Sequence, residues 1–275
     1  MLYLEPSDVA RFQNFIRSWY VKHGRHELPW RQTSDPYQIL VSEMMLQQTQ
    51  VERVVPKYLA FIERFPSTQS LAAAPVSEVL ILWQGLGYNR RAKFLHQAAQ
   101  VVTENYAGKF PETLLELQML PGIGAYTAGA IRNFAYSLAT PLIETNVRTV
   151  YLYHFFPTQA AVPDLDVQEI VVQTLDSKYP REWFWALMDY GSHLKRAVGN
   201  PNKRSKQHTK QSKFAGSLRQ VRGEIIRLLT KQSPLSKEAL SSAITGNTVH
   251  FPDALQQLLD EELLVLTKSG YTLAN

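Results

Sequence analysis

Apolar residues recur at helical spacing along most of this chain. After Ser7, a residue suited to cap a helix, the first apolar stripe begins, and Gly24 predicts where that helix ends. Asp35 and Pro36 predict the cap and first turn of a second helix, which we expect to run through Gln48. No alternating, strand-like run precedes residue 260. We therefore predict an all-α fold for residues 1–195.

Residues 217–275 follow a different pattern. The segments LRQVRGEIIRLLTKQ, SKEALSSAI and FPDALQQLLDEEL predict three short amphipathic helices, and LLVLTKSGYTLAN predicts two strands around Ser269-Gly270. Three helices and a hairpin are typical of a winged-helix module. Such modules bind DNA or serve as packing units, and both alternatives stay open.

A basic segment lies between these two regions. From Lys195 to Lys213 the sequence KRAVGNPNKRSKQHTKQSK carries seven basic residues and no acid, in a chain with a net charge of +5. A local concentration of positive charge attracts polyanions. The segment is either a loop that faces phosphates or a solvated linker.

The chain has 275 residues and no cysteine. Its length favours two domains, or one domain with an appended module. The missing thiols exclude a disulfide scaffold, a thiol nucleophile, a thiolate zinc site and a cysteine-ligated iron–sulfur cluster. No apolar stretch is long enough to span a bilayer, and the beginning of the sequence lacks a basic segment followed by an apolar one. We therefore expect a soluble, cytoplasmic protein.

A glycine-containing turn stands between two apolar helical segments in LQMLPGIGAYTAGAIRNF. Gly122 and Gly124 permit a close backbone approach, so N–H groups and the positive end of the next helix can face an anion. The turn can therefore hold a phosphate. A tight turn between two helices without a ligand is the alternative.

Several motifs, co-linear along the chain, resemble known proteins. LPGIGAYTAGAI resembles the hairpin of the helix-hairpin-helix/GPD base-excision DNA glycosylases, and LPWRQTSDPYQILVSEMMLQQTQV, GLGYNRRAKFLHQAA and KFPETLLELQMLPGIGAYTAGAI resemble the MutY-like adenine DNA glycosylases among them. The resemblance implies a bilobal fold. One lobe would comprise residues 1–29 and 137–195 and the other residues 30–136, followed by a basic linker at 196–216 and the winged-helix-like module at 217–275.

Cleavage of an N-glycosidic bond to a purine needs an acid for the leaving base and negative charge near the sugar. Glu43 falls on the apolar stripe of its predicted helix, where burial would keep a proton on the carboxyl group. The resemblance assigns it as the proton donor. Glu144 in PLIETNVRTV matches an aspartate that stabilises the sugar cation, and a structural ion pair is its alternative role. Asn146 is expected to orient a carboxylate or a water molecule, or to cap a helix.

The resemblance also assigns residues that contact DNA. Tyr126 stands where strand-cleaving relatives have a lysine, which predicts a monofunctional glycosylase. Gln48 and Tyr88 match the residues that fill the gap left by the extruded base, with a core position as the alternative for Tyr88. Trp30 and Arg31 match the base pocket, although Trp30 also suits ordinary packing at a helix start.

Three features depart from the adenine glycosylase pattern. Trp185 stands where the family has a glutamine or glutamate that contacts adenine, and such a position also suits a thymine or uracil mismatch glycosylase. The four cysteines of a [4Fe–4S] cluster are missing, and we expect Lys203, Arg204 and Lys206 to provide the phosphate contacts without a metal. The final segment is too short for the family's usual 8-oxoguanine reader.

The sequence therefore predicts a monomeric, monofunctional DNA glycosylase without metal or cofactor. Its expected substrate is double-stranded DNA with a damaged or mispaired base, specifically adenine opposite guanine or 8-oxoguanine. The alternatives are a thymine or uracil mismatch glycosylase and a DNA-binding protein without catalysis. Retention of both carboxylates argues against the last of these.

Overall fold

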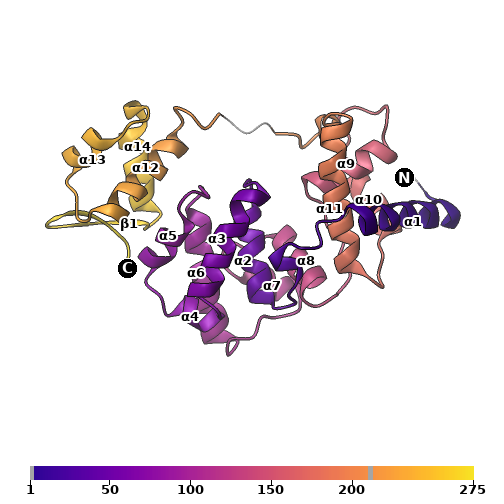
Figure 1. Cartoon of the computed structure of the whole chain (residues 1–275), viewed down its shortest axis with the longest axis horizontal. Helices are drawn as coiled ribbons and strands as arrows, with labels where there is room; N and C mark the ends of the chain where they lie inside the picture. Colours follow the sequence, from indigo (N-terminus) through magenta and orange to yellow (C-terminus); the bar gives the residue numbers. More distant parts are fainter. Residues whose placement is uncertain (1–2, 210–212) are drawn as a thin grey trace. The chain divides into compact units, whose positions relative to one another are not determined.

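The computed structural model describes residues 3–209 and 213–275, so Lys210 of the basic segment lies outside the described residues. The chain divides into two compact units. Unit 1 comprises Met1–Ile39, Glu112–Gln118 and Ile123–Lys210, and unit 2 comprises Leu40–Pro111, Met119–Gly122 and Gln211–Asn275. Helices dominate both units, as Figure 1 shows. The division differs from the expected domain boundaries because residues 217–275 share a unit with the helices of Leu40–Pro111.

Unit 1 is built around the close packing of two helices, α9 on α11. A Cβ atom at Gly191 of α11 would lie 2.1 Å from the carbonyl oxygen of Asn146, so this approach requires glycine. Trp183 of α11 packs edge-on against Phe12 of α1, with ring centroids 5.8 Å apart. The elements of unit 1 are α1 Pro6–His23, η1 Pro29–Arg31, α7 Leu114–Met119, α8 Ala125–Phe134, α9 Thr145–His154, α10 Asp164–Thr174, α11 Pro180–Ala197 and η2 Pro201–Arg204, and helix α2, Pro36–Leu46, begins in this unit and continues into unit 2.

One of three predicted helix boundaries, at Ser7, Gly24 and Asp35, differs from the structure, and the other two are confirmed. Ser7 does not cap α1, because the helix begins one residue earlier with Pro6, whose missing N–H costs nothing in the first turn. Gly24 follows the last residue of α1, as predicted. Asp35 accepts a hydrogen bond from the backbone N–H of Tyr37 at 2.9 Å, which confirms the predicted cap of α2.

Unit 2 contains the remaining helices and a hairpin. The predicted three helices and hairpin of residues 217–275, which we call the C-terminal module, are present, with the antiparallel strands paired from Leu264–Leu273 to Thr267–Gly270. The elements of unit 2 are α3 Val51–Arg64, α4 Thr68–Ala72, α5 Val76–Trp83, α6 Arg90–Asn105, α12 Leu218–Lys231, α13 Lys237–Ala243, η3 Thr248–His250, α14 Phe251–Asp260, β1 Leu264–Thr267 and β2 Gly270–Leu273.

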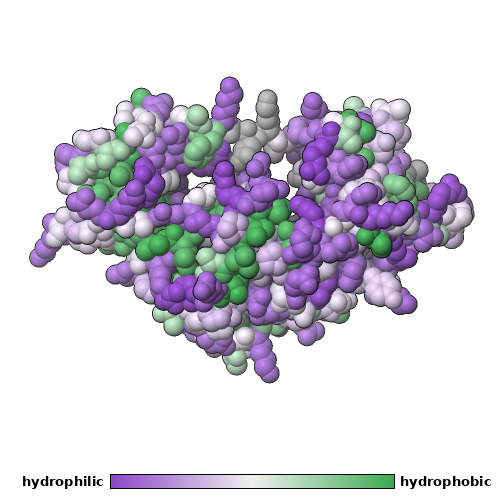
Figure 2. Space-filling view, viewed as in Figure 1, coloured by the Kyte–Doolittle hydropathy of each residue, from purple (hydrophilic) through white to green (hydrophobic). Residues whose placement is uncertain are grey.

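Apolar side chains form the interior of each unit. In unit 2, the fully buried ring of Phe61 packs against those of Phe65 and Trp83, with centroid distances of 5.1 and 6.1 Å. Hydrophilic residues cover most of the face shown in Figure 2. Among the described residues, no helix is long and apolar enough to cross a membrane.

Candidate active site and DNA-contacting residues

Glu43 lies in helix α2 within the part of the helix that belongs to unit 2. The residue is 6% exposed, and its neighbours Ser42 and Met44 are each 1% exposed. The predicted burial of this carboxyl group is therefore confirmed. Burial disfavours the charged form of a carboxyl group, which is the condition a proton donor needs.

Glu144 lies immediately before α9 in unit 1 and caps that helix. Its Oε1 atom accepts hydrogen bonds from the backbone N–H groups of Asn146 at 2.7 Å and Val147 at 2.8 Å. Burial raises the pKa of Glu144, although these two hydrogen bonds and the charges of Lys195 and Arg148 act in the opposite direction. The structure thus gives Glu144 a capping role that sequence analysis missed, because glutamate is uncommon as a helix cap.

Asn146 connects Glu144 to a lysine. Its Nδ2 group donates to Oε2 of Glu144 at 3.2 Å, and its Oδ1 atom accepts from Nζ of Lys195 at 2.7 Å. Burial lowers the pKa of Lys195, against the attraction of Glu144. Asn146 therefore holds the Glu144 carboxylate, which is one of the two roles predicted for it. Its other predicted role, the cap of helix α9, belongs to Glu144.

Arg31 is held in unit 1 by Asp189 of α11. Two nitrogen atoms of Arg31 donate to the two carboxylate oxygens of Asp189 at 2.7 and 2.9 Å, and Arg25 binds the same carboxylate. Burial alone would raise the pKa of Asp189, but the hydrogen bonds and charges of the two arginines hold it below its usual range. Removing one partner of such a buried pair typically costs about 3–5 kcal/mol. Arg31 is therefore a structural residue, and its role in the base pocket stays a prediction.

Trp185 is enclosed within unit 1 and is 7% exposed. Its ring stacks on Phe134 with centroids 5.6 Å apart, and the guanidinium carbon of Arg31 lies 5.3 Å from it. This large ring occupies space rather than presenting a polar edge to a base. Trp30 is also buried, with 5% exposure, as ordinary packing predicts.

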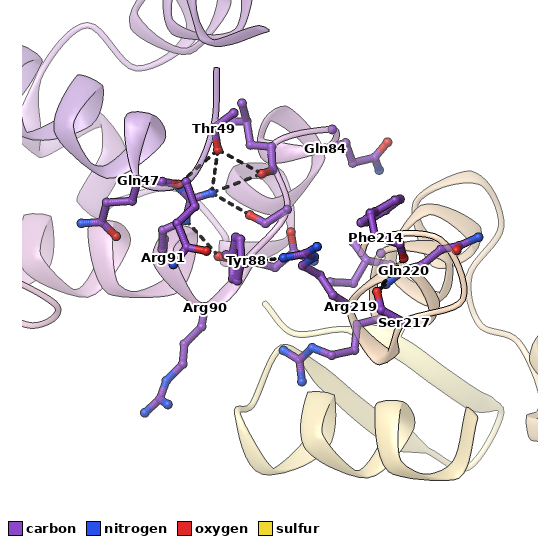
Figure 3. A pocket seen from close by; sticks show the side chains of 18 of the residues that line it. Gln47, Thr49, Gln84, Tyr88, Arg90, Arg91, Phe214, Ser217, Arg219 and Gln220 are labelled. Carbon is purple, nitrogen blue, oxygen red and sulfur yellow. Dashed lines mark hydrogen bonds between the residues drawn. The ribbon is translucent and has the colours of Figure 1, made fainter. Parts of the chain in front are cut away.

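The two residues predicted to fill the gap in DNA lie together in unit 2. Gln48 and Tyr88 both line a pocket of about 1340 Å³, part of which is seen in Figure 3. Both have left-handed backbone conformations, with φ of 54° for Gln48 and 48° for Tyr88. Such a conformation costs about 1–3 kcal/mol in a residue with a side chain and persists only where the surroundings impose it.

Arg91 binds the backbone next to both residues, and sequence analysis did not single it out. This buried side chain of α6 donates hydrogen bonds to carbonyl groups of the last turn of α2, of the loop after it and of the loop that precedes Tyr88. The carbonyl oxygens belong to Met44 at 2.5 Å, Met45 at 3.1 Å, Gln47 at 2.8 Å, Leu86 at 3.2 Å and Gly87 at 2.9 Å. Burial lowers the pKa of Arg91 to about 10, so it stays charged at neutral pH.

We expect Arg91→Lys to destabilise the protein by about 2–3 kcal/mol, because a lysine has three donors and cannot reach both loops in the plane of a guanidinium group. Urea unfolding followed by circular dichroism measures the loss. The control is Arg90→Lys, which changes an exposed neighbour whose guanidinium carbon lies 4.9 Å from the Phe94 ring. Equal unfolding midpoints for the two variants would contradict the role assigned to Arg91.

The two glycines of the turn differ in backbone conformation and in the space around them. Gly122 has φ of 72°, and a Cβ atom there would lie 2.5 Å from Cβ of Phe94. Gly124 has φ of −88°, precedes α8 directly and has open space where a side chain would stand. Gly122 is thus required by backbone conformation and packing, while Gly124 leaves the N-terminus of α8 uncovered. Tyr126 is the second residue of that helix.

Residues 204–206 of the basic segment are fastened to unit 1 by hydrogen bonds. Arg204 donates to the carbonyl oxygen of Leu152 at 2.7 Å, and the backbone of Val162 pairs with Arg204 and Lys206 at 2.9 Å each. Lys203 and Lys206 have exposed side chains, whereas Arg204 is partly buried. The two lysines are therefore the residues available to phosphates on a fixed backbone.

Replacing both Lys203 and Lys206 by alanine should weaken DNA binding and reduce the slope of log affinity against log salt concentration by roughly 2, because each phosphate contact contributes about 0.9. Binding is measured by fluorescence anisotropy at several salt concentrations. Lys22→Ala, at an exposed position in the last turn of α1, is the control for a changed net charge. An unchanged slope in the double variant would refute the predicted phosphate contacts.

The side chains present do not suit an iron–sulfur cluster. The sequence has no cysteine, and the described residues contain no group of three or more histidine, cysteine, aspartate or glutamate side chains that could hold a metal ion. In the segment that corresponds to the cluster ligands, Lys195 donates a hydrogen bond to Asn146 and Arg204 donates one to the carbonyl oxygen of Leu152.

Comparison with known proteins agrees with the fold and the motifs. Residues 41–174 match the HhH-GPD superfamily of base excision DNA repair proteins. The chain is similar to the solved structure of a thermostable thymine-DNA glycosylase, with 25% identity and a TM-score of 0.60 over 68% of this chain and 87% of that one. A structure of an endonuclease III–DNA complex gives the same TM-score at 17% identity, covering 71% of this chain and 90% of that one. The fold and the sequence match together place this protein in the HhH-GPD superfamily.

Curated sequences narrow the class further. The chain is 37% identical to the adenine DNA glycosylase of Mycolicibacterium smegmatis, and the match covers 93% of both proteins. The adenine DNA glycosylase of Buchnera aphidicola (subsp. Baizongia pistaciae) is 35% identical over 66% of this chain, which spans about half, 52%, of that relative's length. The chain belongs to the adenine DNA glycosylase family.

Proposed function

We propose that this protein hydrolyses the N-glycosidic bond of adenine mispaired with guanine or 8-oxoguanine in double-stranded DNA. The observation that carries the proposal is the buried carboxyl group of Glu43 in a chain 37% identical to an adenine DNA glycosylase over nearly its whole length. A buried acid can protonate a leaving purine, which a solvated carboxylate does poorly at neutral pH.

In the proposed reaction, Glu43 donates its proton to the adenine ring while the bond between the base and C1′ of the sugar breaks. The positive charge that develops on the sugar is stabilised by the carboxylate of Glu144, which Asn146 and two backbone N–H groups hold in place. Water then forms the new bond to C1′ and loses a proton. The products are free adenine and an abasic site.

The enclosed ring of Trp185 favours a second candidate, removal of thymine or uracil from a mismatch. Trp185 presents no amide or carboxyl group to an adenine edge and is covered by Phe134. The similarity to a thymine-DNA glycosylase structure is compatible with this alternative.

A panel of duplexes distinguishes the two substrates. Each duplex carries A, T, U or hypoxanthine opposite G or 8-oxoguanine, and abasic sites formed by the protein are cleaved with alkali and counted. We expect excision of adenine, without excision of thymine or uracil. Release of thymine or uracil alone would replace the first candidate with the second, and release of no base would support a DNA-binding protein without catalysis.

We further infer that the enzyme is monomeric, contains no iron–sulfur cluster and leaves the DNA strand intact. Tyr126 has no amine for an imine with the opened sugar, so borohydride added during turnover should trap almost no protein on DNA. Tyr126→Lys provides the comparison, because it puts an amine at the second position of α8. Trapping of most of the unmodified protein would contradict a monofunctional reaction.

A further inference from the structure

Tyr88 is held from two sides within unit 2. On one side, Arg91 donates to the carbonyl group of Gly87, and its guanidinium carbon lies 5.5 Å from the Tyr88 ring. On the other side, Arg219 donates a hydrogen bond to the Tyr88 hydroxyl group, and its guanidinium carbon lies 5.1 Å from the same ring. Figure 3 shows Tyr88 and Arg219 directed toward one another.

Arg219 comes from a distant part of the sequence, the first turn of α12 in the C-terminal module. Phe214, just before this helix, lies 5.4 Å from the Arg219 guanidinium carbon and lines the same pocket. The pocket therefore joins the Tyr88 loop to the C-terminal module through alternating aromatic and cationic groups.

The C-terminal module is fastened to the helical part of unit 2 at two points, one in α12 and one just after α14. Gln84 donates to the hydroxyl group of Thr230 at 2.5 Å. Lys93 donates to the carbonyl oxygen of Glu261 at 2.8 Å and pairs with the Glu262 carboxylate at 2.6 Å. Contacts at both of these points mean that Arg219 reaches Tyr88 from a fastened helix rather than from a loose tail.

Within the module, α12 rather than α14 carries the residue that contacts the Tyr88 loop. Helix α14, the third α-helix of the module, ends in Asp260, and Glu261 and Glu262, which follow it, pair with Arg222 and Lys93. Helix α12, in contrast, presents Arg219 to the pocket. The module thus contacts the Tyr88 loop through its first helix.

We propose that Arg219 is a positioning residue that holds Tyr88 in the conformation needed to fill the gap when the target base leaves the stack. This inference rests on the proposed glycosylase function. Filling the gap demands a side chain already ordered at the correct place, because ordering it during binding consumes binding free energy. Arg219 supplies that order to the side chain through one hydrogen bond and one cation–π contact.

The test compares a paired target base with one that is already unpaired. Single-turnover excision is measured on the mispaired base that the unmodified enzyme removes, and again on the same base placed opposite a stable abasic analogue. Arg219→Ala should slow excision roughly tenfold on the mispair and less than about twofold on the unpaired base, as expected for loss of a cation–π contact and a charged hydrogen bond. The fluorescence of 2-aminopurine beside the target reports base extrusion. With the mispair, it should rise roughly tenfold more slowly in Arg219→Ala than in the unmodified enzyme.

Two further variants separate positioning from folding. Tyr88→Phe keeps the ring but removes the hydroxyl group, so it should reproduce part of the Arg219→Ala defect and add little to it in the double variant. Lys231→Ala removes an exposed positive charge from the last turn of the same helix and should leave both rates unchanged. Thermal unfolding checks that all variants are folded.

The outcomes distinguish this inference from the proposed function. If the unmodified protein excises no base from any duplex, the proposed function fails. If the unmodified protein excises a base, two results refute the positioning role and leave the glycosylase function standing. In one, Arg219→Ala has the same excision rates as Lys231→Ala. In the other, the rate of Arg219→Ala falls by the same factor on paired and unpaired targets.

Discussion

Glu43→Gln is expected to reduce adenine excision by at least roughly a hundredfold, and up to about ten-thousandfold, which is the contribution of a well-placed general acid. Glutamine has nearly the same shape but no acidic proton to donate. The buried position makes the exchange informative, because a carboxyl group that is 6% exposed has little contact with bulk solvent. Single-turnover excision from a duplex with adenine opposite 8-oxoguanine measures the loss.

The control for this variant is Glu52→Gln in the first turn of α3, where the side chain is exposed. That variant makes the same carboxyl-to-amide exchange at an exposed position and should leave excision within about twofold of the unmodified rate. DNA affinity should be retained in Glu43→Gln, since the change does not remove a positive charge. An active Glu43→Gln protein on adenine would show that another group protonates the base, whereas residual activity on thymine would support pyrimidine excision, which does not require protonation at N7.

The helical fold was predictable because its signal is repeated many times. Each amphipathic helix carries several apolar residues at the correct spacing, so an error at one position, such as Ser7, shifts a boundary without changing the fold. The end of α2 illustrates the limit of this signal. The apolar pattern predicts a helix through Gln48, but the helix ends at Leu46, where Arg91 satisfies carbonyl groups of the last turn and Gln48 has a left-handed backbone conformation.

The positioning residues were not predictable in the same way. Arg91, Asp189 and Arg219 each act through a partner far away in the sequence, and no local spacing indicates such pairs. A weak signal did exist for two of them. Asp189 interrupts the apolar face of α11, and Arg91 stands beside Ala92 on the buried side of α6, and a charged residue at such a position implies a buried partner.

Glu144 caps helix α9 in addition to its proposed role in catalysis, so a test of catalysis needs a substitution that keeps the cap. Glu144→Ala removes the acceptor for the N–H groups of Asn146 and Val147, so it should cost about 1 kcal/mol of stability as well as activity. Glu144→Gln retains one acceptor oxygen but loses the charge. Stability should therefore be nearly unchanged in Glu144→Gln, while excision falls by roughly a hundredfold or more, as when a group that stabilises developing charge is lost.

Stability and excision are expected to depend on pH in opposite directions through Glu144. Because burial raises the pKa of Glu144, the folded protein binds its proton more tightly than the unfolded chain does. The stability from this group is fully present below the ordinary glutamate pKa of about 4.3 and is lost as the pH rises through the folded value. Excision, which needs the carboxylate, should instead fall on acidification, beginning above that ordinary value.

Glu144→Asp completes the comparison, because aspartate keeps the charge, caps helices well and is the residue that the family carries here. We expect its excision rate to lie within about tenfold of the unmodified protein, with the acidic fall retained, because only the reach of the carboxylate changes. The residual activity of Glu144→Gln should lack that fall. If Gln and Asp variants were equally active with the same pH profile, Glu144 would be a helix cap alone, and the charge that stabilises the sugar would have to come from another residue.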